Sequence, residues 1–250
     1  MKISFPHIHL KQVDSTNLYA QELITKINPP DGFAVFADYQ TAGKGQYGRN
    51  WESASGKNLL VSFIFNPYFI PIDSMFLLHQ IASLSIIECL SKYITQVYAV
   101  KWPNDIYVSD QKIAGILIQN IIRGSKIQHT IMGIGLNINQ EDFGHLKQAC
   151  SLYTLTGKAF KIKEILCELH QMVLKYYMKI QANPKSSFLE AYNLNLYKLN
   201  ETISFSSTEG FIHGKILGVD KEGKLILESH DNIQKYTFGE INWNTSLGEL

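Results

Sequence analysis

The chain has 250 residues, of which 23 are basic and 22 acidic, and its formal net charge at pH 7 is +1. This length allows one large domain and one small domain. The near-neutral charge excludes an overall positive electrostatic field of the kind that attracts nucleic acid, so any cationic binding site has to be local.

The cysteines, histidines and apolar segments narrow the class further. Cys89, Cys150 and Cys167 lie far apart and form no Cys-x-x-Cys pair, which argues against a disulfide framework and favours a reducing, cytoplasmic compartment. The histidines form no ligand cluster, so we expect no protein-built metal site. The start of the chain lacks the apolar core of a signal peptide. The most apolar window, residues 76–94, contains charged side chains and predicts a globular helix, not a membrane span.

The first third of the chain predicts a helix and two strands. Asp14 or Ser15 can cap a helix that ends at Asn28-Pro29-Pro30. Apolar and β-branched residues predict strands over 33–37 and 58–65, and a glycine-rich loop joins them.

The middle third predicts a second helix and a hairpin. Asp73 opens a helix, and residues 97–100 read as a strand. A hairpin follows, with arms at 106–108 and 112–122, and another strand is expected over 129–139.

The last third changes from helical to β patterning. An apolar stripe from Ile162 to Tyr176 predicts an amphipathic helix, and a second helix is expected over 188–197 after Pro184. Short β segments follow at 203–205, 210–217, 224–228 and 234–238. Together the elements predict an α+β fold with packed helices on a mixed, largely antiparallel sheet in residues 1–199, and a small β domain in residues 200–250.

The loop Gly43-Lys44-Gly45-Gln46-Tyr47-Gly48-Arg49 has the spacing of a dinucleotide-binding fingerprint but not its context. A strand precedes it, yet a polar stretch and a second strand follow where a helix is required. No Gly-Lys-Ser/Thr closes it as a Walker A loop. Its backbone N–H groups can still form a nest for carboxylate or phosphate oxygens, with lysine and arginine supplying charge.

Six motifs share one order and spacing with a known family. They are Asp14-Ser15-Thr16-Asn17, Gln40-Thr41-Ala42-Gly43-Lys44-Gly45, Arg49-Asn50-Trp51, Lys101-Trp102-Pro103-Asn104-Asp105, Lys112-Ile113-Ala114-Gly115-Ile116-Leu117 and Gly133-Ile134-Gly135-Leu136-Asn137-Ile138-Asn139. Together they resemble the biotin protein ligases, and the likeness resumes near Gly218-Val219-Asp220 and Gly239-Glu240-Ile241.

The resemblance implies a class II synthetase-like catalytic domain followed by an SH3-like β-barrel. It also implies an activity: biotin is activated by ATP, with Mg²⁺, as biotinyl-5'-AMP and transferred to a lysine of a biotin carboxyl carrier protein domain. The partner would be a carboxylase, not nucleic acid or a membrane, and the resemblance allows a homodimer. Since 13 residues precede Asp14, too few for a helix-turn-helix, we expect the form without an amino-terminal DNA-binding domain.

The resemblance also assigns residues. Lys112 would contact both the biotin carboxylate and the α-phosphate, with Arg49 and Asp105 as its catalytic companions. The nucleotide would meet Arg49, Trp51, Asn104, Lys112 and Asn137. Biotin would meet Ser15, Thr16, Asn17, Gln40, Gly43, Lys44, Gly45, Gln46, Lys112 and Gly115.

One departure and two rival functions stay open at this point. The family's loop commonly reads Gly-Arg-Gly-Arg-x-Gly-Arg, whereas this chain has Lys44 and Gln46 at the first two arginine positions, and a neutral amide lacks the charge and fork of a guanidinium. Retention of the intermediate is therefore in question. The rivals are a lipoate-type protein ligase and a non-catalytic biotin sensor.

Overall fold

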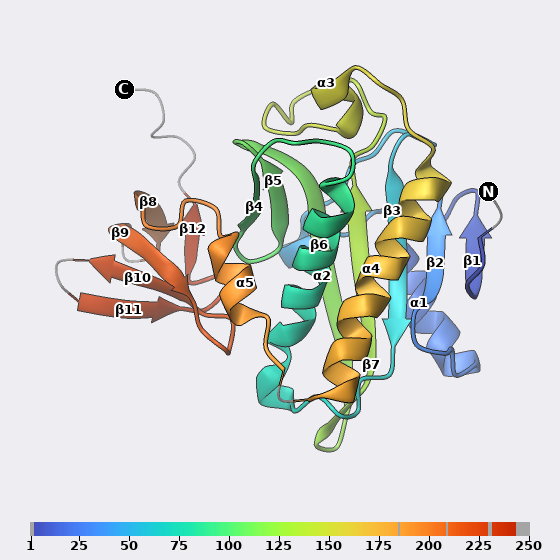
Figure 1. Cartoon of the computed structure of the whole chain (residues 1–250), viewed down its shortest axis with the longest axis horizontal. Helices are drawn as coiled ribbons and strands as arrows, with labels where there is room; N and C mark the ends of the chain where they lie inside the picture. Colours follow the sequence, from blue (N-terminus) through green and yellow to red (C-terminus); the bar gives the residue numbers. More distant parts are fainter. Residues whose placement is uncertain (1–2, 185, 209, 230–231, 244–250) are drawn as a thin grey trace.

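The computed structural model describes residues 3–184, 186–208, 210–229 and 232–243 as a large α+β layer joined to a smaller β module (Figure 1). The strands of the large sheet are β1 (His7–Leu10), β2 (Phe33–Ala37), β3 (Leu59–Phe65), β4 (Tyr98–Lys101), β5 (Asp105–Val108), β6 (Gln111–Arg123) and β7 (Lys126–Leu136). The helices are α1 (Thr16–Lys26), α2 (Phe76–Leu90), α3 (Leu152–Thr156), α4 (Ile162–Ala182) and α5 (Leu189–Leu194). The β module contains β8 (Thr202–Ser207), β9 (Gly210–Val219), β10 (Leu225–Ser229), β11 (Asn232–Tyr236) and β12 (Ile241–Trp243).

The large sheet has seven strands in the order β1-β2-β3-β7-β6-β5-β4. β1 and β2 run parallel, and every other neighbouring pair is antiparallel. The expected mixed, largely antiparallel sheet is therefore confirmed. Side chains alternate between its faces: Phe63 and Phe65 of β3 enter the main core, whereas Ile64 packs in a second cluster with Ala20 of α1.

Helices α2 and α4 cover one face of this sheet (Figure 1). The segment Ile72–Leu90 is long and apolar enough for a membrane span, but 61% of its most apolar window is buried inside the fold, which is the burial of a core helix. α2 itself begins at Phe76, because a 3₁₀ turn over Ile72–Ser74 precedes it, so the expected start at Asp73 is three residues early.

Helix α1 lies on the opposite face and is held by a residue far away in sequence. Ser15 occupies the N-cap position, but its side chain makes no capping hydrogen bond. The Thr16 backbone N–H donates instead to Gln40 Oε1 at 2.7 Å. The expected side-chain cap is therefore replaced by a glutamine 24 residues away, which sequence-local reasoning does not reach.

The β module forms its own antiparallel sheet, in the order β11-β10-β9-β8-β12. This confirms the expected carboxyl-terminal β domain. The division at residues 199 and 200 stays a prediction, and residues 244–250 lie outside the described part of the chain. The sequence patterns did not predict β1, α3 and β12, which span only 4, 5 and 3 residues. Helix α5 is shorter than the helix expected over 188–197.

Indole and amide side chains dock the β module on the large sheet. Trp102, which is 1% exposed, donates from Nε1 to Gly223 O at 2.8 Å. In the opposite direction, Trp243 Nε1 of the β module donates to Trp102 O, also at 2.8 Å. Asn193 of α5 donates to Val219 O at 3.0 Å and accepts from Val219 N at 2.8 Å. These bonds satisfy polar groups that docking removes from water.

We expect Asn193→Ala to lower the free energy of unfolding by about 1–3 kcal/mol, because it removes the hydrogen bonds that Asn193 makes to the N–H and C=O of buried Val219. Asn195→Ala is the matched control, since the side-chain bond of Asn195 within the described residues goes to Ala191 O of α5 and not to the β module. Urea denaturation measures both. Equal losses in the two variants would argue against the docking role of Asn193.

Candidate functional site

A cavity of about 710 Å³ lies beside α1 and reaches from the glycine loop to the β module. We call it the central cavity. Its walls come from α1, the loop after β2, the turn between β4 and β5, strands β6 and β7, residues 143–149 and the β module. It therefore collects segments from almost the whole chain.

The floor of the central cavity is made of glycine. Gly115 of β6 pairs with Gly135 of β7, and Gly133 pairs with Ser62 of β3. A Cβ on Gly135 would lie 2.4 Å from the Trp51 ring, and one on Gly115 would lie 2.8 Å from it. The indole thus rests on a strip of bare backbone that no larger residue permits.

A buried polar network forms the end of the cavity nearest α1. The Thr16 hydroxyl donates to Gln40 Oε1 at 3.0 Å. The Ser62 hydroxyl lies 2.8 Å from Thr16 Oγ1 and 2.6 Å from Asn17 Oδ1, and Asn17 Nδ2 donates to Gln119 Oε1 at 3.0 Å. This end therefore offers fixed donors and acceptors to a polar ligand group.

The glycine loop folds into a tight hairpin and is not an open nest. The Gly45 N–H donates to Arg49 O at 2.7 Å, and the Trp51 N–H donates to Gly43 O at 2.9 Å. Gln46 Oε1 and Trp51 Nε1 are buried without a hydrogen-bond partner among the described residues. Because unpaired buried polar atoms are unfavourable, these two atoms indicate where a ligand would bond.

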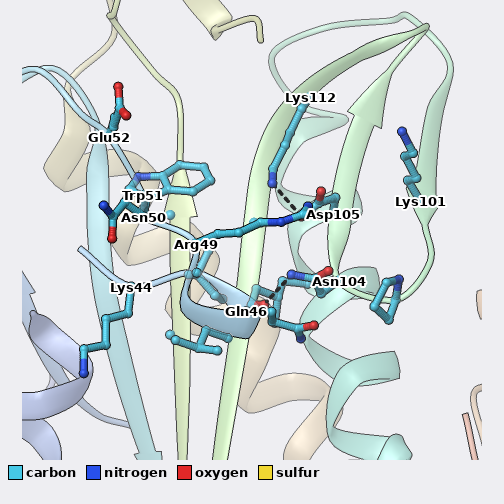
Figure 2. Close-up of a pocket in the computed structure, with 18 of the residues that line it drawn as sticks. Lys44, Gln46, Arg49, Asn50, Trp51, Glu52, Lys101, Asn104, Asp105 and Lys112 are labelled. Atoms are coloured by element: carbon cyan, nitrogen blue, oxygen red, sulfur yellow. Dashed lines mark hydrogen bonds and ion pairs between the residues drawn. The ribbon is translucent and has the colours of Figure 1, made fainter. Parts of the chain in front are cut away.

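Lys112 and Asp105 form an ion pair at the centre of the cavity (Figure 2). Lys112 Nζ lies 2.7 Å from Asp105 Oδ1 and 5.5 Å from the centre of the Trp51 ring. The Lys112 backbone is fixed on both sides, since its N–H donates to Gln148 O at 2.6 Å and its carbonyl accepts from Cys150 N at 2.9 Å. Lys112, which the sequence predicts to contact a carboxylate and a phosphate, is thus a positioned cation in this cavity.

Almost all of the expected site residues line this one cavity. They are Ser15, Thr16, Asn17, Gln40, Lys44, Gly45, Gln46, Arg49, Trp51, Asn104, Asp105, Lys112, Gly115 and Asn137. Gly43 does not: it is buried behind the wall, where a Cβ would lie 2.6 Å from Trp51 O. Its glycine identity therefore serves close packing of the loop.

The side chains of the two expected asparagines, Asn104 and Asn137, donate hydrogen bonds to backbone carbonyl groups. Asn104 Nδ2 donates to Ile116 O at 3.1 Å, which fixes the turn after Pro103 to β6. Asn137 Nδ2 donates to Cys150 O at 3.0 Å and ties the end of β7 to the segment that fixes Lys112. Both amides stand in the cavity wall, so each also presents polar atoms there.

Sequence reasoning missed several residues of the wall. Lys101 was only part of a motif, yet it is 9% exposed and its ammonium donates to Tyr107 OH at 3.1 Å. Burial lowers the pKa of Lys101, because desolvation disfavours the charged form. Further wall residues come from the segment after β7 and from the β module: Phe143, Leu146, Phe238, Ile241 and Trp243.

The cavity is electrically positive although the whole chain is nearly neutral. Its wall has four cations, Lys44, Arg49, Lys101 and Lys112, against two carboxylates, Glu52 and Asp105. No group of three or more potential metal ligands of the His, Cys, Asp and Glu types occurs in the described ranges. The wall thus suits a ligand with several negative charges.

Comparison with known proteins gives two family matches. Residues 9–137 match the Biotin/lipoate A/B protein ligase family, and residues 198–242 match the Biotin protein ligase C terminal domain. The chain is 32% identical to the Bifunctional ligase/repressor BirA of Bacillus spizizenii, covering 94% of this chain and 73% of that protein. It is 28% identical to the Biotin--[acetyl-CoA-carboxylase] ligase of Paracoccus denitrificans, covering 93% of this chain and 98% of that protein.

A solved structure has the same fold over nearly the full chain. The biotin protein ligase from Aquifex aeolicus in complex with biotin and ATP superposes with a TM-score of 0.80 at 30% identity, covering 96% of this chain and 98% of that one.

We expect Gly135→Ala to lower the free energy of unfolding by about 1–3 kcal/mol, because the new methyl group overlaps the Trp51 ring. In a Trp51→Ala background the same change should have little effect, since the colliding ring is gone. Urea denaturation of the four proteins measures this double-mutant cycle. A loss of the same size in both backgrounds would show that the indole does not rest on the glycine strip.

Proposed function

The chain belongs to the biotin protein ligase family, and we propose that its central cavity is where biotin is activated by ATP and passed to protein. The observation that carries this proposal is the placement, in one cavity, of a polar network, a positioned lysine and an excess of positive charge. The ureido group of biotin needs the polar network, the biotin carboxylate needs the positioned lysine, and the triphosphate of ATP needs the positive charge.

Biotin binds at the α1 end in this proposal. Its ureido group has two N–H donors and one carbonyl acceptor, which matches the hydroxyls and amides of Ser15, Thr16, Asn17 and Gln40. The Trp51 ring packs against the glycine strip and lines the cavity, so it offers an apolar surface to the ring and tail of biotin. The tail then brings the carboxylate to Lys112.

In the first half-reaction a biotin carboxylate oxygen attacks the α-phosphorus of ATP, and the bond from that phosphorus to the bridging oxygen breaks. Pyrophosphate leaves with the electron pair, and biotinyl-5'-AMP remains. Lys112 and Arg49 stabilise the negative charge on the α-phosphate oxygens, and Asp105 orients Lys112 through their 2.7 Å ion pair. Because the lysine is already fixed, little reorganisation is needed as charge moves.

Mg²⁺ would enter with ATP. Magnesium is commonly held by one or two protein oxygens plus substrate phosphates, so a dedicated protein cage is not required. Asp105 lies in the wall beside Asn104, whose Nδ2 donates to Ile116 O and whose other polar atom is an oxygen. These two residues fit the ion, which would neutralise phosphate charge there.

In the second half-reaction the ε-amine of an acceptor lysine attacks the carbonyl carbon of the mixed anhydride. AMP leaves, one proton is released, and an amide bond forms. The acceptor we propose is the carrier domain of a biotin-dependent carboxylase. Cys89, Cys150 and Cys167 are free thiols, which supports placing the reaction in the reducing cytoplasm.

The decisive experiment is mass spectrometry of a biotin carboxyl carrier domain incubated with the protein, biotin and MgATP. A mass gain that requires all three supports the proposal. Competition between biotin and lipoate identifies the acid, so preference for lipoate would reassign the enzyme. Tight biotin binding without adenylate would indicate a sensor.

We expect Lys112→Ala to reduce biotin-dependent pyrophosphate release by about 10²–10³-fold, the usual effect of removing one preorganised charge donor. The fold should persist, because Lys112 is partly exposed and its backbone bonds do not depend on the side chain. Circular dichroism checks the fold. Lys161→Ala is the matched control, since that exposed lysine pairs with Glu164 and does not line the central cavity. Near-normal release from Lys112→Ala would remove this lysine from the mechanism.

We expect Gln46→Arg to hold biotinyl-5'-AMP about tenfold longer than the wild-type chain, a change that corresponds to ~1.4 kcal/mol. The reason is that Gln46 Oε1 is buried and finds no partner in the described part of the chain, whereas a guanidinium in its place can donate charge-assisted bonds to the phosphate. Dissociation of labelled adenylate compares the two proteins. Equal dissociation rates would mean that Lys44 or Arg49 already supplies this contact.

A further inference from the structure

Lys101 is a cation of the central cavity to which the proposed mechanism assigns no task. It ends β4 and pairs in register with Asp105 across the turn. Among the described residues, however, Asp105 is ion-paired with Lys112 and not with Lys101. Lys101 is therefore a nearly buried charge in a ligand cavity with no carboxylate partner in the described ranges.

Aromatic rings hold the Lys101 ammonium in place of a carboxylate. Its Nζ lies 4.6 Å from the centre of the Tyr107 ring, 5.2 Å from that of Trp243 and 5.7 Å from that of Tyr197. Tyr107 lies two residues after Asp105 on β5, so both side chains leave the strand on the same face. We call Tyr107, Tyr197 and Trp243 the aromatic cage.

The aromatic cage stabilises a cation without neutralising it. Ring quadrupoles attract an ammonium, but they add no negative charge. Of the three N–H groups of Lys101, one donates to Tyr107 OH at 3.1 Å. The remaining charge is desolvated and faces the cavity, and an anion interacts strongly with such a charge in a water-poor site.

The position of Lys101 decides which part of a ligand it would meet. In Figure 2 Lys44 and Lys101 stand on opposite sides of the view, with Arg49, Lys112 and Asp105 between them. The α1 side has the polar network for biotin, and the central ion pair marks the carboxylate and α-phosphate. Lys101 therefore lies beyond the reacting atoms, where the β- and γ-phosphates of ATP would extend.

We propose that Lys101 binds the pyrophosphoryl end of ATP and that Trp243, from the β module, is a positioning residue for it. This inference rests on the proposed function. In that reaction the α-phosphorus gains a bond to the biotin carboxylate, and the electron pair of the breaking P–O bond moves onto pyrophosphate. A cation at Lys101 stabilises that charge, and no proton or further reactant is needed.

Trp243 connects this role to the β module. It is on β12, and its Nε1 donates to Trp102 O at 2.8 Å, one residue along the chain from Lys101. The same indole is one wall of the aromatic cage. Docking of the β module thus sets the ammonium position, so this module contributes to the adenylation step.

The test compares Lys101→Met and Lys101→Arg in two assays. The first is biotin-dependent exchange of labelled pyrophosphate into ATP, where we expect Lys101→Met to lower kcat/KM by about 10²–10³-fold and to raise the KM for pyrophosphate. The second is transfer from preformed biotinyl-5'-AMP to the carrier domain, which lacks pyrophosphate and should stay within about twofold of wild type. Lys101→Arg keeps the charge and should recover part of the exchange rate.

The outcomes separate this inference from the proposed function. If the wild-type chain neither exchanges pyrophosphate nor transfers biotin, the proposed function fails. If the wild type does both and Lys101→Met exchanges normally, or loses exchange and transfer equally, the role of Lys101 is overturned. Lys92→Met is the matched control, because that exposed lysine pairs with Glu168 outside the cavity wall. Circular dichroism of each variant checks folding.

A double-mutant cycle tests Trp243. We expect Trp243→Leu alone to lower exchange about tenfold, and to have no further effect in the Lys101→Met background, because its action passes through Lys101. Independent, multiplying losses would show that Trp243 acts only on the fold and would overturn the positioning role.

Discussion

The central cavity depends on the absence of side chains at the middle of the large sheet. Protein interiors are close-packed, so a hollow of about 710 Å³ needs a structural cause. Here Gly115, Gly133 and Gly135 leave bare backbone on two central strands, so the Trp51 ring and the Asn17 side chain, which both line the cavity, lie directly against the sheet. Helices α2 and α4 bury the other face, so the strands are held firmly and do not collapse into the gap.

A second constraint is that two lysines lie near one carboxylate. Asp105 is in register with Lys101 on β4 and lies 2.7 Å from Lys112 on β6. Asp105 forms its ion pair with Lys112 and not with Lys101. The other lysine is stabilised by aromatic rings, which leaves the cavity with a surplus of positive charge. That surplus is local, which agrees with a net charge of only +1 for the whole chain.

Local features of the sequence predicted most of the fold. The hairpin of β5 and β6 and the helix α4 follow from patterns contained within a few turns or strands, and both were found where expected. The Gln40 bond at the start of α1 depends on a contact 24 residues away, and β12 is three residues long. Neither leaves a periodic signal in the sequence.

The motifs also predicted which residues would share a cavity, but they did not predict geometry or every member. Gly43 belongs to a motif, yet it packs behind the wall because its neighbour across the loop is the Trp51 carbonyl. Lys101 belongs to a motif as well, but its exposure and its cage depend on Tyr197 and Trp243, 96 and 142 positions later. Only the fold brings such residues together.

Docking of the β module links stability to chemistry in this chain. Trp102 and Trp243 each satisfy a backbone carbonyl across the junction, so separating the two parts would leave buried acceptors unpaired. The same separation would remove Phe238, Ile241 and Trp243 from the cavity wall and open the Lys101 cage to water. Water would weaken the attraction between that ammonium and a phosphate, since the interaction falls as the local dielectric rises. The contacts that hold the module in place are therefore also the contacts that shield from water the end of the cavity proposed for the nucleotide.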